Sequence, residues 1–219
     1  MMQQAELLYQ DQYVLAVHKS AGIRSEGTAE HDLPPILKKQ CGGDIYPVHR
    51  LDRETEGCIL YARTKEAAKR LSAAVVRGEL HKEYLAVIEG KPEEDSALLC
   101  DLLYHDAQKN KSYVVRRERR GVRRAELKYE TLSVKQTERG TLALLAVTLH
   151  TGRTHQIRVQ FASRGHPLVG DSRYGSAERG IPLALLARSL SFPHPMHRGE
   201  TVSVTASVPQ EYPWTLFET

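Results

Sequence analysis

The chain has 219 residues, of which 41% are hydrophobic and 26% charged, so it can bury a core without covalent staples and is not wholly disordered. Its net charge of +4 suits a polyanionic partner but does not require one. Three cysteines, far apart and without a CxxC pair, exclude a disulfide framework and argue against a thiolate metal site.

The sequence has no segment typical of export or of membrane insertion. Its first residues contain neither the basic nor the apolar region of a signal peptide. The longest apolar runs, near Leu142–Leu149 and Ile181–Ala187, are too short to cross a bilayer. We therefore expect a soluble protein of the reducing cytoplasm.

The N-terminal part predicts a hairpin, a short helix and a strand. Ala5–Tyr9 and Tyr13–His18 are apolar runs on either side of a turn, which indicates a hairpin. A short helix is expected at Leu33–Gln40. The polar stretch Cys41–Gly57 then leads into a predicted strand at Cys58–Ala62.

A capped helix and an alternating strand are expected next. Thr64 is placed to cap a helix that runs through Arg77, and Gly78 is placed to terminate it. Lys82–Glu89 alternates in a way that is typical of a strand, with Tyr84 on one of its two faces.

The rest of the chain is rich in strand patterns. Further strands are predicted at Ala97–Leu103, Ser112–Val115, Ala125–Val134, Leu142–His150 and Thr201–Ser207. Thr154–Arg164 predicts a short helix, and Leu183–Phe192 fits either a helix or a strand. The mixed order of elements predicts an α+β fold on a mostly antiparallel sheet, with residues 1–219 forming a single domain.

A charged loop, His49–Gly57, precedes the strand at Cys58–Ala62. It could be a solvated turn in which Asp52 makes local backbone hydrogen bonds. Alternatively, Arg50 and Arg53 flank Asp52 and favour its ionised form. A poised carboxylate of this kind can act as a nucleophile or stabilise a cationic centre at a glycosidic carbon.

Basic residues surround a second segment, Gly152–Arg158, at the start of the predicted helix. A capped helix with exposed cations explains the pattern without any function. As a functional site, Arg153, His155 and Arg158 would form an anion-binding corner with the free helix N–H groups. His155 and Arg158, three residues apart, are expected to share a helix face.

Tyr84 is the residue of the segment Lys82–Tyr84 that could carry chemistry. A tyrosine on a strand is usually a core residue with its hydroxyl at the edge. It gains functional interest only if it faces the same cavity as Asp52.

Arginines are concentrated in Arg116–Arg124, with six in nine residues. A solvated loop is one explanation. Phosphate binding is the other, because arginine suits bidentate phosphate contacts.

No metal or nucleotide cofactor is indicated. His194 and His197 have an HxxH spacing, but prolines interrupt it and further ligands are missing nearby. The sequence contains neither GxGxxG nor a P-loop.

Together these segments resemble the RluA family of RNA pseudouridine synthases. His49–Gly57 is similar to that family's HRLDxxTSG motif, Lys82–Tyr84 to its KxY motif, and Thr151–Arg158 to its TGRxHQIR motif. Gly165–Gly175 resembles the segment that follows, and Leu7–Gly22 resembles the N-terminal strands and NKPxG turn. The resemblance covers nearly the whole chain, and we expect the compact branch of the family, without an N-terminal S4 domain.

The resemblance implies a pseudouridine synthase fold, with a mixed, mostly antiparallel sheet, a few flanking helices and a central cleft. It implies that the enzyme isomerises uridine in ribosomal or transfer RNA after flipping the base, without a cofactor. Asp52 would act as nucleophile or base at the ribose, Arg158 would pair with it, and Tyr84 would stack on the uracil. Arg50 would fill the space of the flipped base.

The RNA-contacting residues implied by the resemblance are His49, Arg50, Arg53, Arg153, His155, Arg119, Arg120, Arg123 and Arg124. We expect a monomer. The sequence does not identify the RNA or the target uridine.

The chain also departs from the family pattern. Glu56 stands where serine is usual, and His18 and Ser20 replace asparagine and proline. Leu127 replaces a threonine. Because Asp52, Tyr84 and Arg158 are retained, we expect activity.

Two other functions remain open from the sequence. A catalytically inactive RNA-binding or ribosome-assembly protein with this fold would bind RNA and form no pseudouridine. A glycosidase would need a second carboxylate, and Glu54 and Glu56 lie on the same short loop, which is poor geometry for flanking a bond.

Overall fold

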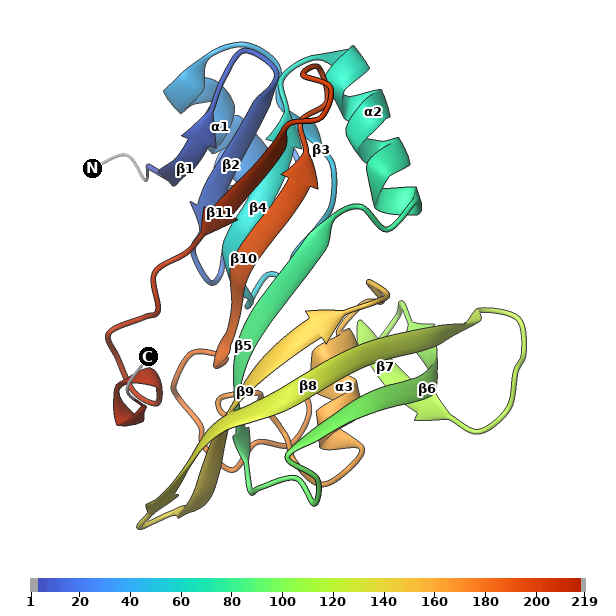
Figure 1. Cartoon of the computed structure of the whole chain (residues 1–219). Coiled ribbons are helices and arrows are strands. Elements are labelled where there is room, and N and C mark those ends of the chain that lie inside the picture. The colour runs from blue at the N-terminus through green and yellow to red at the C-terminus, as the bar shows by residue number, and fades with distance from the viewer. Residues whose placement is uncertain (1–3, 218–219) are drawn as a thin grey trace. The chain divides into compact units, whose positions relative to one another are not determined.

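The computed structural model describes residues 4–217, which divide into two compact units (Figure 1). The first unit takes in the chain up to Lys82 and the returning segment Leu186–Ser207. The second unit comprises Glu83–Leu185 and the C-terminal segment from Val208.

The first unit is a mixed sheet with helices α1 (Leu33–Cys41) and α2 (Lys65–Val76). Its strands are β1 (Glu6–Gln10), β2 (Val14–Lys19), β3 (Tyr46–Pro47), β4 (Glu56–Ala62), β10 (Leu185–Pro193) and β11 (Thr201–Thr205). β1, β2 and β4 are successive antiparallel neighbours, and β11 is antiparallel to β10. The pair of β10 with β4 is parallel, which makes the sheet mixed.

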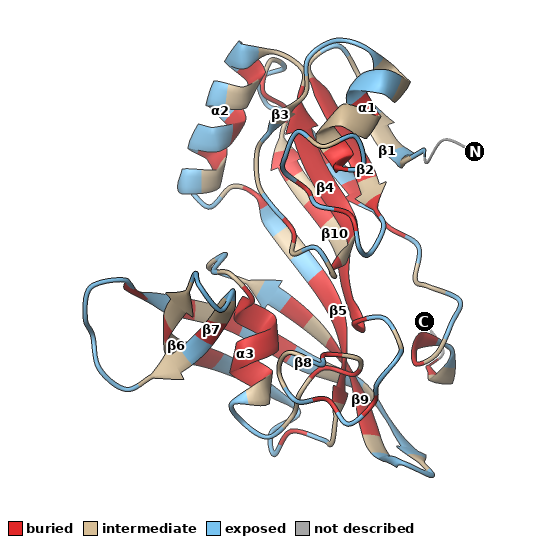
Figure 2. Ribbon diagram, turned by 180° about the vertical axis from the view of Figure 1, so that it is seen from behind, coloured by how far each residue is buried: buried red, intermediate tan, exposed pale blue. Residues whose placement is uncertain are grey.

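Strands β2 and β4 form the core of this unit. Nearly every residue of both strands is buried, as the red ribbons in Figure 2 show. A strand buried on both faces reads as a continuous apolar run, which is the pattern in Val14–Val17 and Cys58–Ala62.

The side chain of Thr64 accepts a hydrogen bond from the Ala67 N–H, which confirms the predicted cap of α2.

The second unit is an antiparallel sheet in the order β5-β9-β8-β6-β7. Its strands are β5 (His81–Glu89), β6 (Ser96–Asp106), β7 (Lys111–Val115), β8 (Val122–Thr137) and β9 (Gly140–Leu149). Helix α3 (Gln156–Ala162) lies over one face of this sheet (Figure 2), where Val159 packs with Leu103 and Ala125. A 3-10 turn, η1 (Trp214–Leu216), follows near the C-terminus.

Some predicted bounds are wrong. The helix expected at Thr154–Arg164 is shorter at both ends. At its start, His155 has a left-handed backbone with φ of 56° that a helix cannot include. The ambiguous segment Leu183–Phe192 contains strand β10. The short strand β3 lies within the stretch expected to be irregular.

The fold class itself is confirmed, since the strand pairing is mixed and mostly antiparallel and the helices are few. In the described part of the chain, no helix combines the length and the apolar character needed to span a membrane.

Candidate active site

The loop that carries Asp52 is fixed by hydrogen bonds to its backbone within the first unit. Leu51 exchanges hydrogen bonds with the Ser25 hydroxyl, which donates to the Leu51 carbonyl at 2.9 Å and accepts from its N–H at 3.2 Å. The Gly22 N–H donates to the Arg53 carbonyl at 2.8 Å. Asp52 is therefore presented from a segment that is bound to the chain on both of its sides.

A buried lysine supports the same loop. Lys19 is fully buried, and its Nζ donates to the carbonyl oxygens of Ser20, Ile23 and Arg53 at 3.0, 2.9 and 3.1 Å. Burial lowers the pKa of Lys19 to about 8, and the negative charge of Asp52 acts in the opposite direction. The sequence indicated no role for Lys19, because lysine is usually exposed.

The end of the loop requires glycine. Gly57 has a φ of 114°, and a Cβ built on it would lie 2.3 Å from the carbonyl oxygen of Ala187 on β10. A side chain here would collide with the backbone of the neighbouring strand. Gly57 thus allows β10 to lie against the start of β4.

His49 has a structural position. Its Nε2 accepts a hydrogen bond from the Leu60 N–H at 3.1 Å, which a protonated ring could not do. Desolvation lowers the pKa of His49 to about 3, with the charge of Lys82 as the second cause. The ring is therefore neutral at pH 7, which favours support of β4 over phosphate binding.

The two arginines beside Asp52 are exposed. Arg53 Nε donates to the Gly22 carbonyl at 2.9 Å, and Arg50 Nη1 lies 3.7 Å from a carboxylate oxygen of Glu26. Weak, exposed contacts of this kind leave a side chain able to move to a ligand.

In the second unit, Arg158 forms a buried, bidentate ion pair with Asp171. Nε and Nη2 of Arg158 donate to Oδ2 and Oδ1 of Asp171 at 2.7 and 2.8 Å. The guanidinium also lies 5.3 Å from the centre of the Tyr174 ring. The sequence did not indicate this partner, and the pairing of Arg158 with Asp52 stays a prediction.

Residues before α3 do not form the expected cationic corner. His155 precedes the helix, so the prediction that it shares a helix face with Arg158 is wrong. Both side chains are buried, and His155 Nδ1 lies 3.0 Å from the Tyr174 hydroxyl. Arg153 is exposed, and its Nε donates to the Arg124 carbonyl at 3.0 Å. Of these three residues, Arg153 is the one at the surface.

Tyr84 and α3 lie on the same face of the second sheet. Tyr84 of β5 pairs with Val147 of β9, which in turn pairs with Tyr129 of β8. Directly opposed residues in antiparallel strands point to the same face. Because the Tyr129 ring contacts Phe161 of α3 at 5.3 Å, this is the face that the helix covers.

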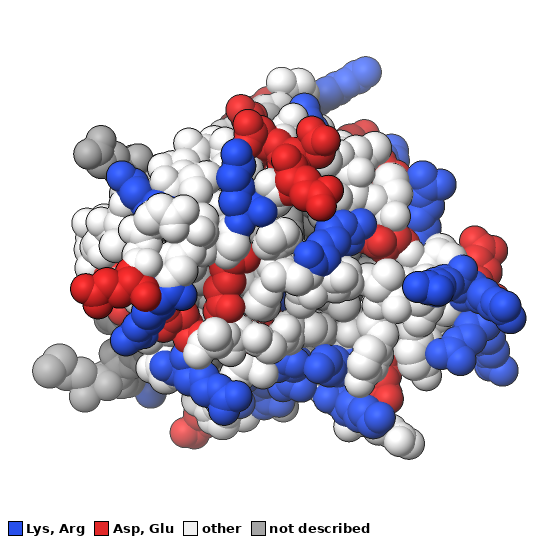
Figure 3. Space-filling view, turned by 90° about the horizontal axis from the view of Figure 1, so that it is seen from below, with Lys and Arg blue, Asp and Glu red and all other residues white. Residues whose placement is uncertain are grey.

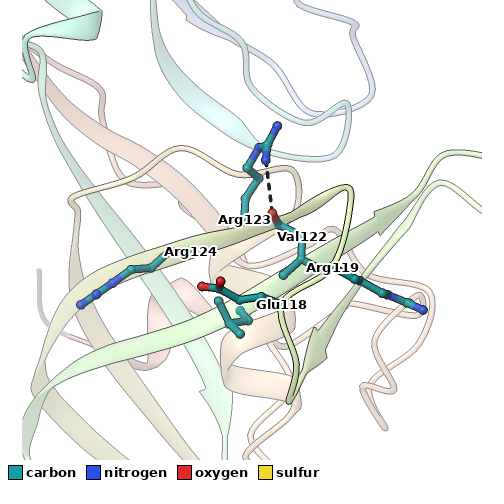
Figure 4. Close-up of a pocket in the computed structure, with 6 residues that line it drawn as sticks. Glu118, Arg119, Val122, Arg123 and Arg124 are labelled. Carbon is teal, nitrogen blue, oxygen red and sulfur yellow. Dashed lines mark hydrogen bonds between the residues drawn. The ribbon is translucent and has the colours of Figure 1, made fainter.

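The arginine-rich loop joins β7 to β8 and borders an open pocket of about 510 Å³. The pocket is lined by Leu102, Glu118, Arg119, Val122, Arg123 and Arg124 (Figure 4). The arginine side chains fan out in different directions, and the Arg119 guanidinium lies 4.7 Å from the Tyr104 ring. Figure 3 shows lysine and arginine side chains on several parts of the molecular face that it presents, with acidic side chains among them. Arginine side chains that point in different directions suit contacts with several successive phosphates better than contacts with one anion.

The two histidines of the HxxH spacing, His194 and His197, contact an aspartate and each other. His194 Nε2 lies 2.7 Å from an Asp11 carboxylate oxygen, and the His194 and His197 rings stack at 4.0 Å. Between residues 4 and 217, no group of three or more histidine, cysteine or carboxylate side chains is arranged to hold a metal ion.

Comparisons with known proteins identify the family. Residues 13–163 match the family model described as RNA pseudouridylate synthase. The chain is 29% identical over 231 residues to tRNA pseudouridine synthase C of Pasteurella multocida. This alignment covers 94% of this chain and 93% of that protein. It is also 29% identical to ribosomal large subunit pseudouridine synthase D of Zymomonas mobilis, over 94% of this chain and 70% of that protein.

A solved structure shares the fold. Human RNA pseudouridylate synthase domain containing 1 superposes with a TM-score of 0.81 at 23% identity, covering 95% of this chain and 85% of the human one. At this identity, the likeness is one of fold. The family match and the curated relatives carry the assignment further: the chain belongs to the RNA pseudouridylate synthase family and is an isomerase that acts on uridine in RNA.

Proposed function

We propose that this enzyme converts a uridine of transfer RNA or ribosomal RNA to pseudouridine, with Asp52 as the catalytic carboxylate. The relatives compared above act, by their names, on one or the other of these RNAs. The observation that supports the role of Asp52 most directly is its loop, which lies within the matched region and is held by hydrogen bonds and by the buried Lys19.

The reaction needs little besides positioned groups. The bond from C1′ to N1 of the uracil breaks, a bond from C1′ to C5 forms, and the proton on C5 is lost while N1 gains one. Atoms and electrons balance without an oxidant, so no cofactor is required. We expect a monomer that works without a cofactor in the cytoplasm.

Each of the proposed catalytic residues contributes to these bond changes and proton transfers. An ionised Asp52 acts at the ribose, either by attack on C1′, by attack on the ring or by removing the 2′ proton. Arg158 supplies a buried, oriented positive charge. Tyr84 presents a ring for stacking on the uracil and a hydroxyl that can help in the final deprotonation.

The RNA must deliver an extruded base. A uridine in a loop is the cheapest to unstack, so we propose a single-stranded or looped target. We propose that Arg50 occupies the space the base vacates. Arg53, Arg153, Arg119, Arg120, Arg123 and Arg124 would contact phosphates and supply affinity rather than sequence choice. For His49 and His155, the hydrogen-bonded rings favour supporting the loops that carry these arginines.

The test is pseudouridine formation by the purified protein. Transfer RNA and ribosomal RNA transcripts labelled with tritium at uridine C5 should release tritium, and pseudouridine mapping with and without the gene should show a lost site. Binding of both RNAs without any tritium release would instead support a non-catalytic RNA-binding protein that has kept the fold.

A further inference from the structure

We propose that Asp171 is a positioning residue for Arg158, and that Tyr174 completes the clamp on the guanidinium. This inference rests on the proposed function, in which Arg158 takes part in the reaction. Neither Asp171 nor Tyr174 is among the residues to which the sequence assigned a role.

The ion pair fixes the orientation of the guanidinium. Exposed fractions of the Arg158 and Asp171 side chains are 3% and 0%, and two nitrogens of Arg158 are committed to the two oxygens of one carboxylate. A guanidinium is planar, so holding Nε and Nη2 also sets the direction in which Nη1 points. One bidentate contact therefore aims the remaining edge of Arg158.

Tyr174 makes the second contact with the same guanidinium. The ring of Tyr174 lies 5.3 Å from the Arg158 guanidinium, within the range of a cation–π contact. The Tyr174 hydroxyl accepts a hydrogen bond from the Ser112 N–H at 2.8 Å and lies 3.0 Å from His155 Nδ1. The ring is thus anchored at its far end to β7 and to the residue that precedes α3.

Asp171 is itself rigidly held. The Tyr174 N–H donates to Asp171 Oδ1 at 3.3 Å, and the Asp171 N–H donates to the Leu168 carbonyl at 3.0 Å. The Val169 N–H then donates to the Val87 carbonyl at 2.9 Å. Because Val87 lies on β5, the strand that carries Tyr84 also anchors the loop that aims Arg158.

Stability alone is a poor explanation for this arrangement. Burying two charges costs solvation free energy, and a buried ion pair is often no more stabilising than apolar side chains of similar volume. What the pair provides is a fixed direction for a charged group, and catalysis depends strongly on such alignment.

A second, more exposed ion pair provides the control, with Arg164 and Asp101 side chains 36% and 13% exposed. Arg164, just past the end of α3, also donates to both oxygens of a carboxylate, at 2.9 and 3.2 Å to Asp101. Asp171→Asn and Asp101→Asn both remove one negative charge and keep the shape. We expect Asp171→Asn to lower kcat by about 100-fold, with RNA Kd unchanged, and Asp101→Asn to leave kcat as in the wild type.

Non-additivity separates positioning from a general structural effect. If Asp171 acts through Arg158, then Asp171→Asn should cause no further loss in an Arg158→Met background under single-turnover conditions. Equal kcat in Asp171→Asn and Asp101→Asn, or a loss that adds to that of Arg158→Met, would overturn the inference. If instead the proposed function is wrong, the Asp52→Asn variant should keep the wild-type turnover rate.

A milder variant decides the matter if Asp171→Asn does not fold. Tyr174→Phe keeps the ring over Arg158 and removes the hydroxyl that anchors it. We expect kcat to fall by about tenfold with RNA Kd unchanged, since a loosened support misaligns the group it holds. Wild-type kcat in this variant would contradict the clamp.

Discussion

Nε2 of His18 lies 2.9 Å from Oε1 of Glu56, and these are two of the positions at which the chain departs from its family's motifs. Where the family usually has asparagine and serine, this chain has a hydrogen-bonded imidazole and carboxylate joining β2 to the start of β4. Nδ1 of the same ring lies 3.4 Å from the Glu6 carboxylate on β1. The extra charge of Glu56 is therefore matched by a second change, and we expect the two to be coupled.

The coupling can be measured by a double-mutant cycle. His18→Asn and Glu56→Ser each introduce the residue usual in the family, and each leaves the other partner of a largely buried pair without its hydrogen bond. We expect the double variant to be more stable than the sum of the single effects by about 1 kcal/mol in unfolding free energy. The exposed pair His197 and Glu200, at 3.0 Å, is the control and should show coupling close to zero. Additive effects of His18→Asn and Glu56→Ser would contradict a coupled pair.

Gly57 provides a test of how tightly the catalytic loop is packed. Gly57→Ala forces a Cβ against the Ala187 carbonyl, whereas Gly140→Ala, at a similar φ of 121°, meets no atom within 4 Å. The two glycines have similar φ values, so the comparison is directed at the overlap. We expect Gly57→Ala to lose about 2 kcal/mol more unfolding free energy than Gly140→Ala in urea denaturation. Similar losses in the two would show that β10 can move away from the loop.

Acid should destabilise the fold through His49. Its folded-state pKa of about 3 lies below the ordinary value of 6.5. Between these values the unfolded chain binds a proton at this ring and the folded chain does not, so stability falls as pH falls through this window. From pH 7 to pH 5 we expect the wild type to lose about 2 kcal/mol more unfolding free energy than His49→Gln.

Exposed His31 serves as the control for that measurement. His31→Gln should follow the pH dependence of the wild type closely. An identical pH dependence in His49→Gln and the wild type would mean that the ring takes up a proton in the folded state, against its hydrogen bond to Leu60.

The arginine loop should govern the salt dependence of RNA binding. Changing Arg119, Arg120, Arg123 and Arg124 to glutamine should reduce the slope of log Kd against log salt by about one for each phosphate that an arginine no longer neutralises. Changing the exposed lysines Lys38, Lys39, Lys65 and Lys69 to glutamine alters net charge equally and should affect the slope less. Equal slopes in the two quadruple variants would place the loop away from the bound RNA.

Local patterns predicted most of the fold. The alternation in Lys82–Glu89 and the capped apolar face after Thr64 correspond to β5 and α2, because both depend on neighbours in the sequence. β10 stayed ambiguous, since its strand form depends on parallel pairing with the distant β4. Helix α3 was predicted to begin too early, because nothing in the pattern reveals the left-handed backbone of His155.

The candidate site was predictable only in part. The resemblance to the family's motifs indicated Asp52, Tyr84 and Arg158, and their roles remain predictions. The support given by Lys19 and Asp171 was missed because it arises from tertiary contacts: a lysine buried among carbonyls and a carboxylate whose partner is 13 residues away. Lysine and aspartate are usually exposed, so the residue types alone suggest surface positions for Lys19 and Asp171.

The central claim is that an ionised Asp52 performs the chemistry, and the substitution Asp52→Asn tests it most directly by removing the charge while keeping the shape. Glu54→Gln removes the same charge from the same loop and is the matched control. Tritium release from labelled RNA should fall by at least about 1000-fold in Asp52→Asn, with RNA affinity retained, and should stay near the wild-type rate in Glu54→Gln. A folded Asp52→Asn variant that forms pseudouridine at the wild-type rate would contradict the claim.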